Sequence, residues 1–259
     1  MYLFSITIAA IYPSIFVRID PYTIDVTKRL LPPCRAHWFG TDDLGRDLFS
    51  RVIWGTRSSL LAGVSVALGA TIIGTIIGVI SGFFSNILDN ILMRLTDAFL
   101  AFPNILLAII LSMAFGRGLL PAVLALIVSW WPWYARLARA QVLQIKELLF
   151  IEAARAVGAS AMRILVKHIL LNIISPLLVQ TTLDIAFAIL YTASLSFIGL
   201  GAQEPLPEWG AMLNRARAFA LTAWWYITFP GLAIFVTVLA INILGDAIRD
   251  LYSPQKRYK

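Results

Sequence analysis

The side chains that could carry out acid–base, nucleophilic or metal chemistry are few and far apart in the sequence. The chain has two histidines, His37 and His168, and one cysteine, Cys34. The two histidines lie in segments that we assign to opposite sides of a membrane, so they cannot form a zinc site by themselves. A phosphate-binding loop of the type G-x-x-x-x-G-K-[ST] is absent, because the sequence contains no Gly-Lys pair. The sequence therefore predicts no catalytic residue, no metal site and no cofactor bound by this chain.

One carboxylate, Asp184, lies inside a long apolar run. At the centre of a bilayer a charged side chain costs roughly 2.5–3.5 kcal/mol on insertion scales, so Asp184 should face the interior of a helix bundle or water. A functional role would place it on a translocation pathway or against a cation. The structural alternative is a hydrogen bond to Thr181, to Thr182 or to a partner helix.

Long uncharged runs define the elements that must position these residues. Apolar residues make up 59% of the 259-residue chain and charged residues 14%, and the mean hydropathy is +0.82. Soluble globular domains contain about 45–50% apolar and about 25% charged residues, whereas a membrane-spanning helix needs about 20 mostly apolar residues. We therefore predict an all-α fold, a polytopic transmembrane helical bundle of about six spans. The predicted spans are residues 1–17, 57–84, 95–115, 119–138, 169–198 and 223–245.

The spans divide the chain into three parts. Residues 1–56 hold a first, retained span and an extracytoplasmic segment, residues 57–246 form the transmembrane domain, and residues 247–259 form a tail. Lys and Arg are slightly denser on the side that the tail shares with residues 136–168, and the positive-inside rule places this side in the cytoplasm. We assign the net charge of +7 to these membrane-facing loops rather than to nucleic-acid binding.

Two patterns within the apolar runs predict how the spans pack. Glycines recur every four residues along the second span, on one face, where they would let another helix approach closely. These glycines are Gly74, Gly78 and Gly82. An aromatic cluster, Trp130, Trp131, Trp133 and Tyr134, is expected at the cytoplasmic end of the fourth span as an anchor in the membrane interface.

The charged segment 139–168 has the clearest pattern of a partner-binding element. Its first part is rich in helix formers and contains no Gly or Pro before Gly158, which can end a helix in the left-handed conformation. A second short helix should begin near Ser160 and run into the fifth span. Glu152 is followed by two alanines, and this small face would fit deep in a groove of a partner. An interfacial amphipathic helix without a partner is an equal alternative on physical grounds alone.

This segment resembles the EAA loop of the membrane subunits of bacterial and archaeal ABC importers. The residues that carry the resemblance are Glu152-Ala153-Ala154, Gly158 and Leu170. His168 and Leu171 stand where the usual pattern has Ile and Pro, and the histidine variant is similar to the peptide branch of these importers.

A second motif narrows the resemblance. Residues 37–51, HWFGTDDLGRDLFSR, are similar to the H-x-x-G-T-D-x-x-G-R-D-x-x-S-R signature of the dipeptide/oligopeptide/nickel permease family, in its second membrane subunit. Three later segments also resemble that family, and together the motifs cover the chain from about residue 20 to 254. These segments are residues 194–201, 207–210 and 242–250.

The resemblance implies a type I ABC importer transmembrane fold in the cytoplasmic (inner) membrane of a prokaryote. It implies four kinds of partner: a homologous second permease subunit, two ABC ATPase subunits, an extracytoplasmic substrate-binding protein and the lipid bilayer. ATP and Mg would be bound by the ATPase subunits, and this chain would be a non-catalytic membrane subunit. The residues implied to make or shape the contact with an ATPase subunit are Glu152, Ala153, Ala154 and Gly158.

Charged and aromatic residues in two other segments are then expected on the extracytoplasmic face. They are Asp42, Arg46, Asp47, Glu204, Glu208 and Trp209. Such residues could pair with one another and hold the outer loops in place. They could instead contact the binding protein or form an extracytoplasmic gate, and the sequence leaves both roles open.

The function predicted from the sequence is ATP-driven, binding-protein-dependent import, with di- or oligopeptides as the first choice of cargo. Nickel and oligosaccharides are alternative cargoes within the same family. A stand-alone channel or ion-coupled transporter is the alternative from a different class, and it differs in being active without partner subunits. An intramembrane enzyme is the least favoured reading, because the spans contain no nucleophile–base pair.

Overall fold

The structure, a computed structural model, describes residues 2–84 and 86–252. Helices make up nearly all of its regular structure, which confirms the predicted all-α class. The helices are α1 (Tyr2–Ile11), α2 (Leu48–Phe84), α3 (Ile87–Leu100), α4 (Asn104–Phe115), α5 (Leu119–Lys146), α6 (Leu149–Ala156), α7 (Ala161–Ile164), α8 (Leu171–Phe197), α9 (Trp209–Ala216) and α10 (Trp224–Tyr252). Short 3-10 turns cover Pro13–Ile15, Val26–Lys28 and Arg217–Phe219, and a π-helical segment, Leu165–Leu170, joins α7 to α8.

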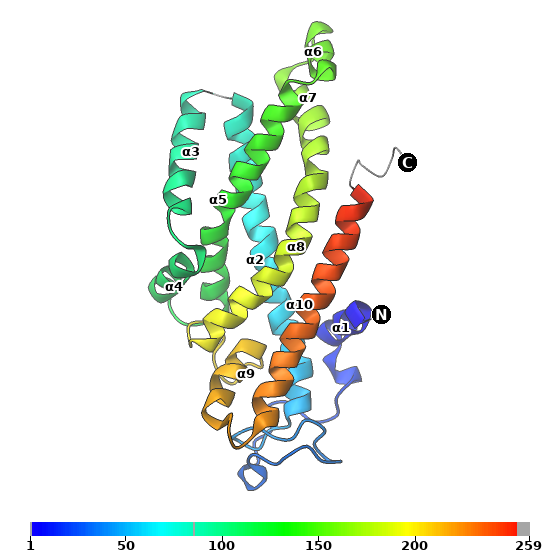
Figure 1. The fold of residues 1–259 in the computed structure, drawn as a ribbon, viewed down its shortest axis with the longest axis vertical. Coiled ribbons are helices and arrows are strands. Elements are labelled where there is room, and N and C mark those ends of the chain that lie inside the picture. Colours follow the sequence, from blue (N-terminus) through cyan, green and yellow to red (C-terminus); the bar gives the residue numbers. More distant parts are fainter. Residues whose placement is uncertain (1, 85, 253–259) are drawn as a thin grey trace.

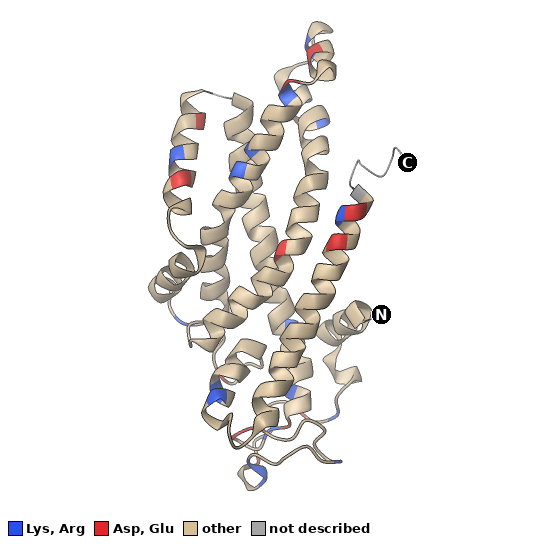
Figure 2. Ribbon diagram, viewed as in Figure 1, with Lys and Arg blue, Asp and Glu red and all other residues tan. Residues whose placement is uncertain are grey.

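The helices form an elongated bundle in which α2, α5, α8 and α10 run along the long axis (Figure 1). The short helix α6 projects from one end, and the loops that precede α2 gather with α9 at the other end. Charged residues collect toward these two ends and are sparse between them (Figure 2). This distribution is that of a bundle whose middle lies in hydrocarbon.

Among the described residues, three helices are long and apolar enough to cross a membrane: Leu48–Phe84, Ala161–Phe197 and Trp224–Leu251. A fourth span arises if α3 and α4, which meet at 92°, are counted as one bent span. We predicted about six. The two that fall short are α1, whose ten residues span only about 15 Å, and α5, whose second half carries Arg, Gln and Lys and is therefore less apolar.

Several predicted boundaries shift, each for a local reason. The second span begins at Leu48 rather than at residue 57, because the Asp47 carboxylate accepts the Ser50 N–H at 2.8 Å and so caps the start of α2. The predicted division of the chain at residue 56 therefore falls inside a helix. The third span breaks before Pro103, which cannot continue an α-helix. The last helix continues to Tyr252, and the rest of the predicted tail, 253–259, lies outside the described residues.

The aromatic cluster was placed wrongly at the end of a span. Helix α5 continues to Lys146, so the cluster lies in the middle of the helix. Trp130, Trp131 and Tyr134 are buried, and only Trp133 is half exposed. Three of the four rings thus pack inside the bundle rather than anchor it in the membrane interface.

The predicted close helix approach is confirmed, and the partner helix is α5. A Cβ atom added at Gly74 or Gly78 would overlap the carbonyl oxygens of Trp131 and Ala135, and one at Gly82 would lie 3.0 Å from Cβ of Val142. The backbones of α2 and α5 are therefore in direct contact over these two turns. This pair forms the most extensive helix contact in the described chain.

Replacing Gly78 with Ala should destabilise the bundle, because the new methyl group would force α2 and α5 apart. Overpacking of this kind costs about 1–3 kcal/mol. A matched control is Gly231→Ala in α10, where the nearest atom to a new Cβ, on Leu213, is 4.0 Å away. Thermal unfolding in detergent should show a lower Tm for Gly78→Ala only. Equal Tm values for the two variants would contradict the close contact.

Candidate functional site

The segment with the EAA resemblance forms a helical hairpin at one tip of the molecule (Figure 1). Helix α6 ends as predicted at Gly158, which has φ +80. The Gly158 N–H donates to the Arg155 carbonyl at 2.9 Å, and the Ala159 N–H to the Ala154 carbonyl at 3.0 Å. This pair of bonds is a Schellman motif, which requires a left-handed residue at that point. The next helix, α7, begins at Ala161 and is capped by Ser160, whose hydroxyl accepts the Arg163 N–H at 3.3 Å.

One face of α6 packs on the bundle and the other is free in this chain. Ile151 is fully buried and belongs to the same apolar cluster as Ile164 and Ile169. Glu152 and Ala153 are exposed, whereas Ala154 is half-buried against the cluster. Large apolar side chains nearby are also exposed: Leu149 (81%), Val157 (84%) and Met162 (68%). The tip therefore presents an apolar surface with one carboxylate.

The end of α5 that leads into α6 is fixed to its neighbours by polar contacts. Nζ of Lys146 donates to the carbonyl oxygens of Gly82 and Phe83 at 3.1 and 3.0 Å, at the C-terminal end of α2. Arg139 forms a two-point ion pair with Asp89 of α3, with distances of 2.7 and 2.8 Å. Movement of α6 would consequently be transmitted to α2 and α3 as well as to α5.

Arg46 joins the two outer segments at the opposite end of the molecule. Its Nε donates to Oδ2 of Asp42 at 2.6 Å, and its Nη1 donates to Oε2 of Glu204 at 2.6 Å. Arg51 donates from Nη2 to both carboxylate oxygens of Glu204 at 3.3 Å. Asp42, Arg46 and Arg51 are at most 2% exposed, and the Glu204 side chain is 29% exposed. Two positive and two negative groups balance one another, which makes their burial possible.

Asp42, Arg46, Arg51 and Glu204 form an ionic cluster. For Glu204 and for Arg46, burial shifts the pKa in one direction and the charged partners shift it in the other. Desolvation raises the pKa of Glu204, but hydrogen bonds and charges from Arg46 and Arg51 outweigh it, so that this pKa lies below its ordinary value. Desolvation lowers the pKa of Arg46, but its contacts with Glu204 and Asp42 outweigh it and the pKa is raised. Both results favour the charged forms.

Glu208 and Trp209 attach α9 to α2. The buried Glu208 carboxylate accepts two backbone N–H groups at the start of α9, at 3.0 and 2.9 Å, and the Ser59 hydroxyl at 3.2 Å. Desolvation raises the pKa of Glu208 despite these hydrogen bonds. Trp209 is 1% exposed and donates from Nε1 to the Val52 carbonyl at 2.9 Å. These contacts hold the outer loop against the outer end of α2.

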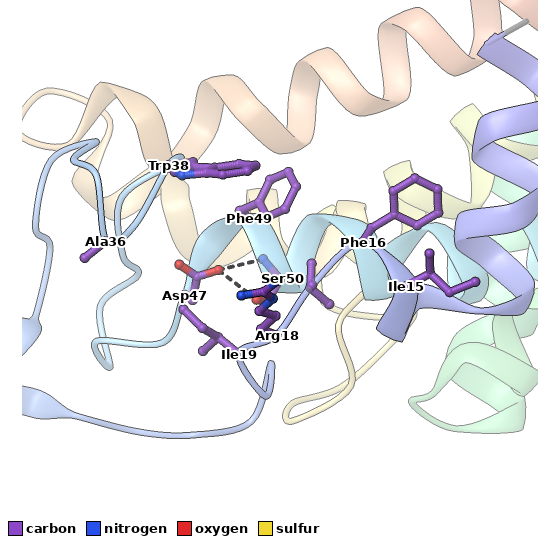
Figure 3. Close-up of a pocket in the computed structure, with 10 residues that line it drawn as sticks. Ile15, Phe16, Arg18, Ile19, Ala36, Trp38, Asp47, Phe49 and Ser50 are labelled. Atoms are coloured by element: carbon purple, nitrogen blue, oxygen red, sulfur yellow. Dashed lines mark hydrogen bonds between the residues drawn. The ribbon is translucent and has the colours of Figure 1, made fainter.

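Asp47 lies at the wall of an outer cavity of about 600 Å³ (Figure 3). Besides capping α2, Asp47 contacts Nδ1 of His37 at 2.8 Å. The rings of Trp38 and Phe49 lie on the same wall, with their centroids 5.1 Å apart. Neighbouring Asp43 accepts from Arg215 of α9 at 2.5 Å and from Tyr226 of α10 at 2.9 Å. Residues 37–51 thus connect to α2, α9 and α10 together.

The six residues predicted on the extracytoplasmic face differ in their exposure to solvent. Asp42, Arg46, Asp47, Glu208 and Trp209 are all buried, and Glu204 is the member that reaches the surface. The hydrogen bonds and ion pairs described above join all six candidates to other residues of their own chain. A contact with a binding protein, or a gate, stays a prediction for these residues.

Asp184 lies inside the apolar span Ala161–Phe197. Its Oδ2 accepts the Tyr134 hydroxyl at 2.6 Å and its Oδ1 accepts from Gln180 at 3.1 Å. The hydroxyls of Thr181 and Thr182, which we considered as partners, donate instead to carbonyls one turn earlier in α8. The sequence analysis missed Tyr134, because that residue was assigned to an interfacial cluster. The spacing of Gln180 and Asp184, one turn apart, could have indicated their pairing.

These features define the class of the protein. It is a multi-pass helical membrane protein with an exposed helical surface at one tip and an ionisable residue, Asp184, inside a span. At the other end, residues 37–51 and 204–209 are joined by ion pairs and hydrogen bonds into what we call the outer loop layer. The chain belongs to the family described as binding-protein-dependent transport system inner membrane component, whose model matches residues 74–258.

Named relatives agree with this family. The chain is 48% identical to a protein of Escherichia coli K12 named as a D,D-dipeptide transport system permease, over 91% of this chain and 79% of that protein. It is 49% identical to a glutathione transport system permease protein of Escherichia coli O6:K15:H31, over 86% of this chain and 74% of that protein. It is 42% identical to a protein of Brucella suis named as a peptide transport system permease, over 96% of this chain and 84% of that protein.

Solved structures agree on the fold. An inward-facing structure of the MetNI methionine ABC transporter matches with a TM-score of 0.65 at 20% identity, and covers 80% of this chain and 98% of the matched chain. The fold is therefore the type I ABC importer transmembrane fold, as predicted.

Replacing Arg46 with Ala should strongly destabilise the outer loop layer, because it leaves the buried Asp42 carboxylate without its principal cation. Breaking a buried ion pair costs about 3–5 kcal/mol. Arg57→Ala is the control, since Arg57 is also in the outer part of α2 but is exposed. Limited proteolysis of residues 18–47, together with Tm, should detect the difference. A protected loop in Arg46→Ala would show that the cluster does not hold it.

The stability of the same layer should depend on pH through Glu204. Because the folded pKa of Glu204 is lowered, its contribution is fully present above its ordinary value of 4.5 and is lost as pH falls through the folded pKa. Glu204→Gln should be less stable than wild type at pH 7, and the difference should shrink on acidification below about pH 4.5. A difference that is constant from pH 7 to pH 3 would exclude this contribution.

Proposed function

We propose that this chain is the permease subunit of an ATP-driven importer that moves di- or oligopeptides across the cytoplasmic membrane of a prokaryote. The single observation that carries the proposal is the identity of 42–49% over most of the chain to relatives named for dipeptide, glutathione and peptide transport. The family name includes dependence on a binding protein. In this proposal the chain itself catalyses no reaction.

Coupling to ATP hydrolysis would occur at the tip formed by α6. The exposed carboxylate of Glu152, the small side chain of Ala153 and the neighbouring apolar side chains suit insertion into a cleft of an ATPase subunit, with Ala154 and Gly158 shaping the helix end. Two such ATPase subunits would bind ATP and Mg in the cytoplasm. Because α6 is joined through α5 to α2 and α3, closure of the ATPases would rock the spans between inward-open and outward-open arrangements.

At the other end, the interlocked outer layer would form the platform on which the substrate-binding protein releases its cargo. Its ion pairs and the hydrogen bond from Tyr226 to Asp43 join the start of α2 to α9 and α10. Docking on this layer would therefore act on three helices at once. Glu204, at the surface, is the member of the cluster that a docked protein could reach. A homologous second permease subunit would complete the pathway.

The coupling role predicts a defined effect of Gly158→Val and of Glu152→Lys. Each should lower peptide uptake while ATP hydrolysis by the complex continues, because the helix end or its charge no longer fits the ATPase cleft. The control is Gly116→Val. Gly116 also has a positive φ (+97) and nothing within 4 Å of a new Cβ atom, so valine there causes a similar backbone strain of about 1–3 kcal/mol. Because Gly116 follows α4 and is far from α6 in the sequence, this strain should not affect coupling. Normal transport in both α6 variants would refute the assignment.

The function as a whole is tested with the chain purified together with the products of its neighbouring genes. ATPase activity in proteoliposomes should rise when the binding protein is loaded with a peptide pool, and should not rise when the binding protein is loaded with nickel or left empty. Flux through this chain alone, with no associated ATPase, would instead indicate a channel or ion-coupled transporter.

A further inference from the structure

A small cavity of about 270 Å³ is lined by residues of α4, α5 and α8. Three of its lining side chains are polar and five are aromatic. The lining residues are Asn104, Gln180, Asp184, Trp130, Trp133, Tyr134, Phe187 and Tyr191. These residues take no part in the contacts described above at the two ends of the molecule. An ionisable residue such as Asp184 inside a span is costly, so its presence there indicates a function.

Asp184 provides unused acceptor capacity in this cavity. Its two oxygens accept hydrogen bonds from Tyr134 and Gln180, both of which are neutral. A carboxylate has about four acceptor sites, so two are left for another donor. Within the ranges 2–84 and 86–252, no Lys, Arg or His forms an ion pair with it. Its negative charge therefore lacks a cation in the described part of this chain.

Trp130 lines the same cavity with its ring, while its indole N–H is a buried donor without an acceptor in the part of the chain that the structure describes. The residue is 8% exposed, and its Nε1–H has no hydrogen-bond partner in the described chain. The ring stands edge-on to Tyr191, with centroids 5.2 Å apart. Because Nε1 is closed off from water, Trp130 contributes its ring to the cavity wall and not its donor.

The cavity opens at the surface of this chain. Trp133 and Phe187, at its rim, are each 52% exposed. A carboxylate beside such an opening cannot face lipid without a large cost, so the opening must face water or protein. In a transporter built from two permease subunits, the water-filled path between them meets this requirement.

We propose that this cavity binds the free amino-terminal end of a peptide in transit, with the ammonium group at Asp184 and the aromatic rings around it. Aromatic faces beside a carboxylate are the usual surroundings of a bound ammonium group. The volume is at the lower limit of ligand pockets, which suits one terminal residue rather than a whole peptide. The inference rests on the proposed import of peptides and adds the part of the peptide that is recognised within the membrane.

The test uses the complete complex in nanodiscs without the binding protein, so that the permease alone selects the ligand. The probes are trialanine and N-acetyl-trialanine, and their binding is compared by saturation-transfer NMR. The wild type should bind trialanine about tenfold or more tightly than the acetylated form, since acetylation removes the charge that pairs with Asp184. Asp184→Asn should lose this preference without a change in Tm.

Two further variants separate recognition from packing. Trp130→Phe should keep the preference for the free amino group, because it retains an aromatic ring at the wall and removes only an N–H that does not reach the cavity. Trp224→Phe, which alters an exposed tryptophan at the start of α10, should change neither affinity. Equal binding of the two probes to the wild type would overturn the inference, as would failure of Asp184→Asn to assemble with the second permease subunit, which would indicate a partner side chain in the cavity.

Uptake by the complete system, with its binding protein, separates this inference from the proposed function. If wild-type proteoliposomes import trialanine with ATP and Asp184→Asn imports it at the same rate, the cavity is not on the path and only the inference fails. If the wild type imports no peptide, the proposed function fails as well.

Discussion

The close approach of α2 and α5 is the contact on which the rest of the structure depends. Glycines at every fourth position of α2 allow backbone to meet backbone, because a Cβ atom at Gly74 or Gly78 would overlap the backbone of α5. The same two helices carry the distinctive features of both ends. The outer end of α2 holds Arg51 of the ionic cluster, and the inner end of α5 leads into α6.

This arrangement provides a physical route between the two ends of the molecule. Lys146 and Arg139 fasten the inner end of α5 to α2 and α3, and Tyr134, on the same helix, reaches the carboxylate at mid-span. A displacement of α6 would therefore reach the cavity beside Asp184 through one helix, α5. In the same way, α2 connects the outer loop layer to the inner end. Two stiff helices in contact are suited to a rocking motion between two states rather than to gradual bending.

The outer layer shows how a sequence motif can be structural and still serve a transporter. Most of the charges in residues 37–51 are turned inward, where opposite signs balance within the loops and against Glu204. In a largely buried, charge-balanced cluster, the loss of one member leaves an opposite charge unpaired, which is strongly destabilising. Its effect is to give the outer face one shape, which a partner could recognise through its surface rather than through the buried charges themselves.

Local chemistry made the helical features readable from the sequence. Uncharged runs predicted an all-helical membrane protein, Gly158 predicted the end of α6, and the spacing of Gly74, Gly78 and Gly82 predicted a close helix partner. Each of these depends on one residue type or a short period along one helix. The breaks and extensions were harder to predict, because Asp47 caps α2 upstream of its apolar run and α5 continues past it through polar residues.

Only the tertiary structure decided which residues meet. The sequence alone determined that Asp184 must avoid lipid, but its partners, Tyr134 and Gln180, and the unpaired donor of Trp130 emerged only when α5 packed beside α8. Likewise, Arg46 and Glu204 are far apart in the chain and meet because α9 is held against α2. The composition of a segment and the spacing of its apolar or small residues indicate what kind of surroundings a residue needs. Which side chains satisfy that requirement depends on how helices distant in sequence are packed, and no local pattern encodes it.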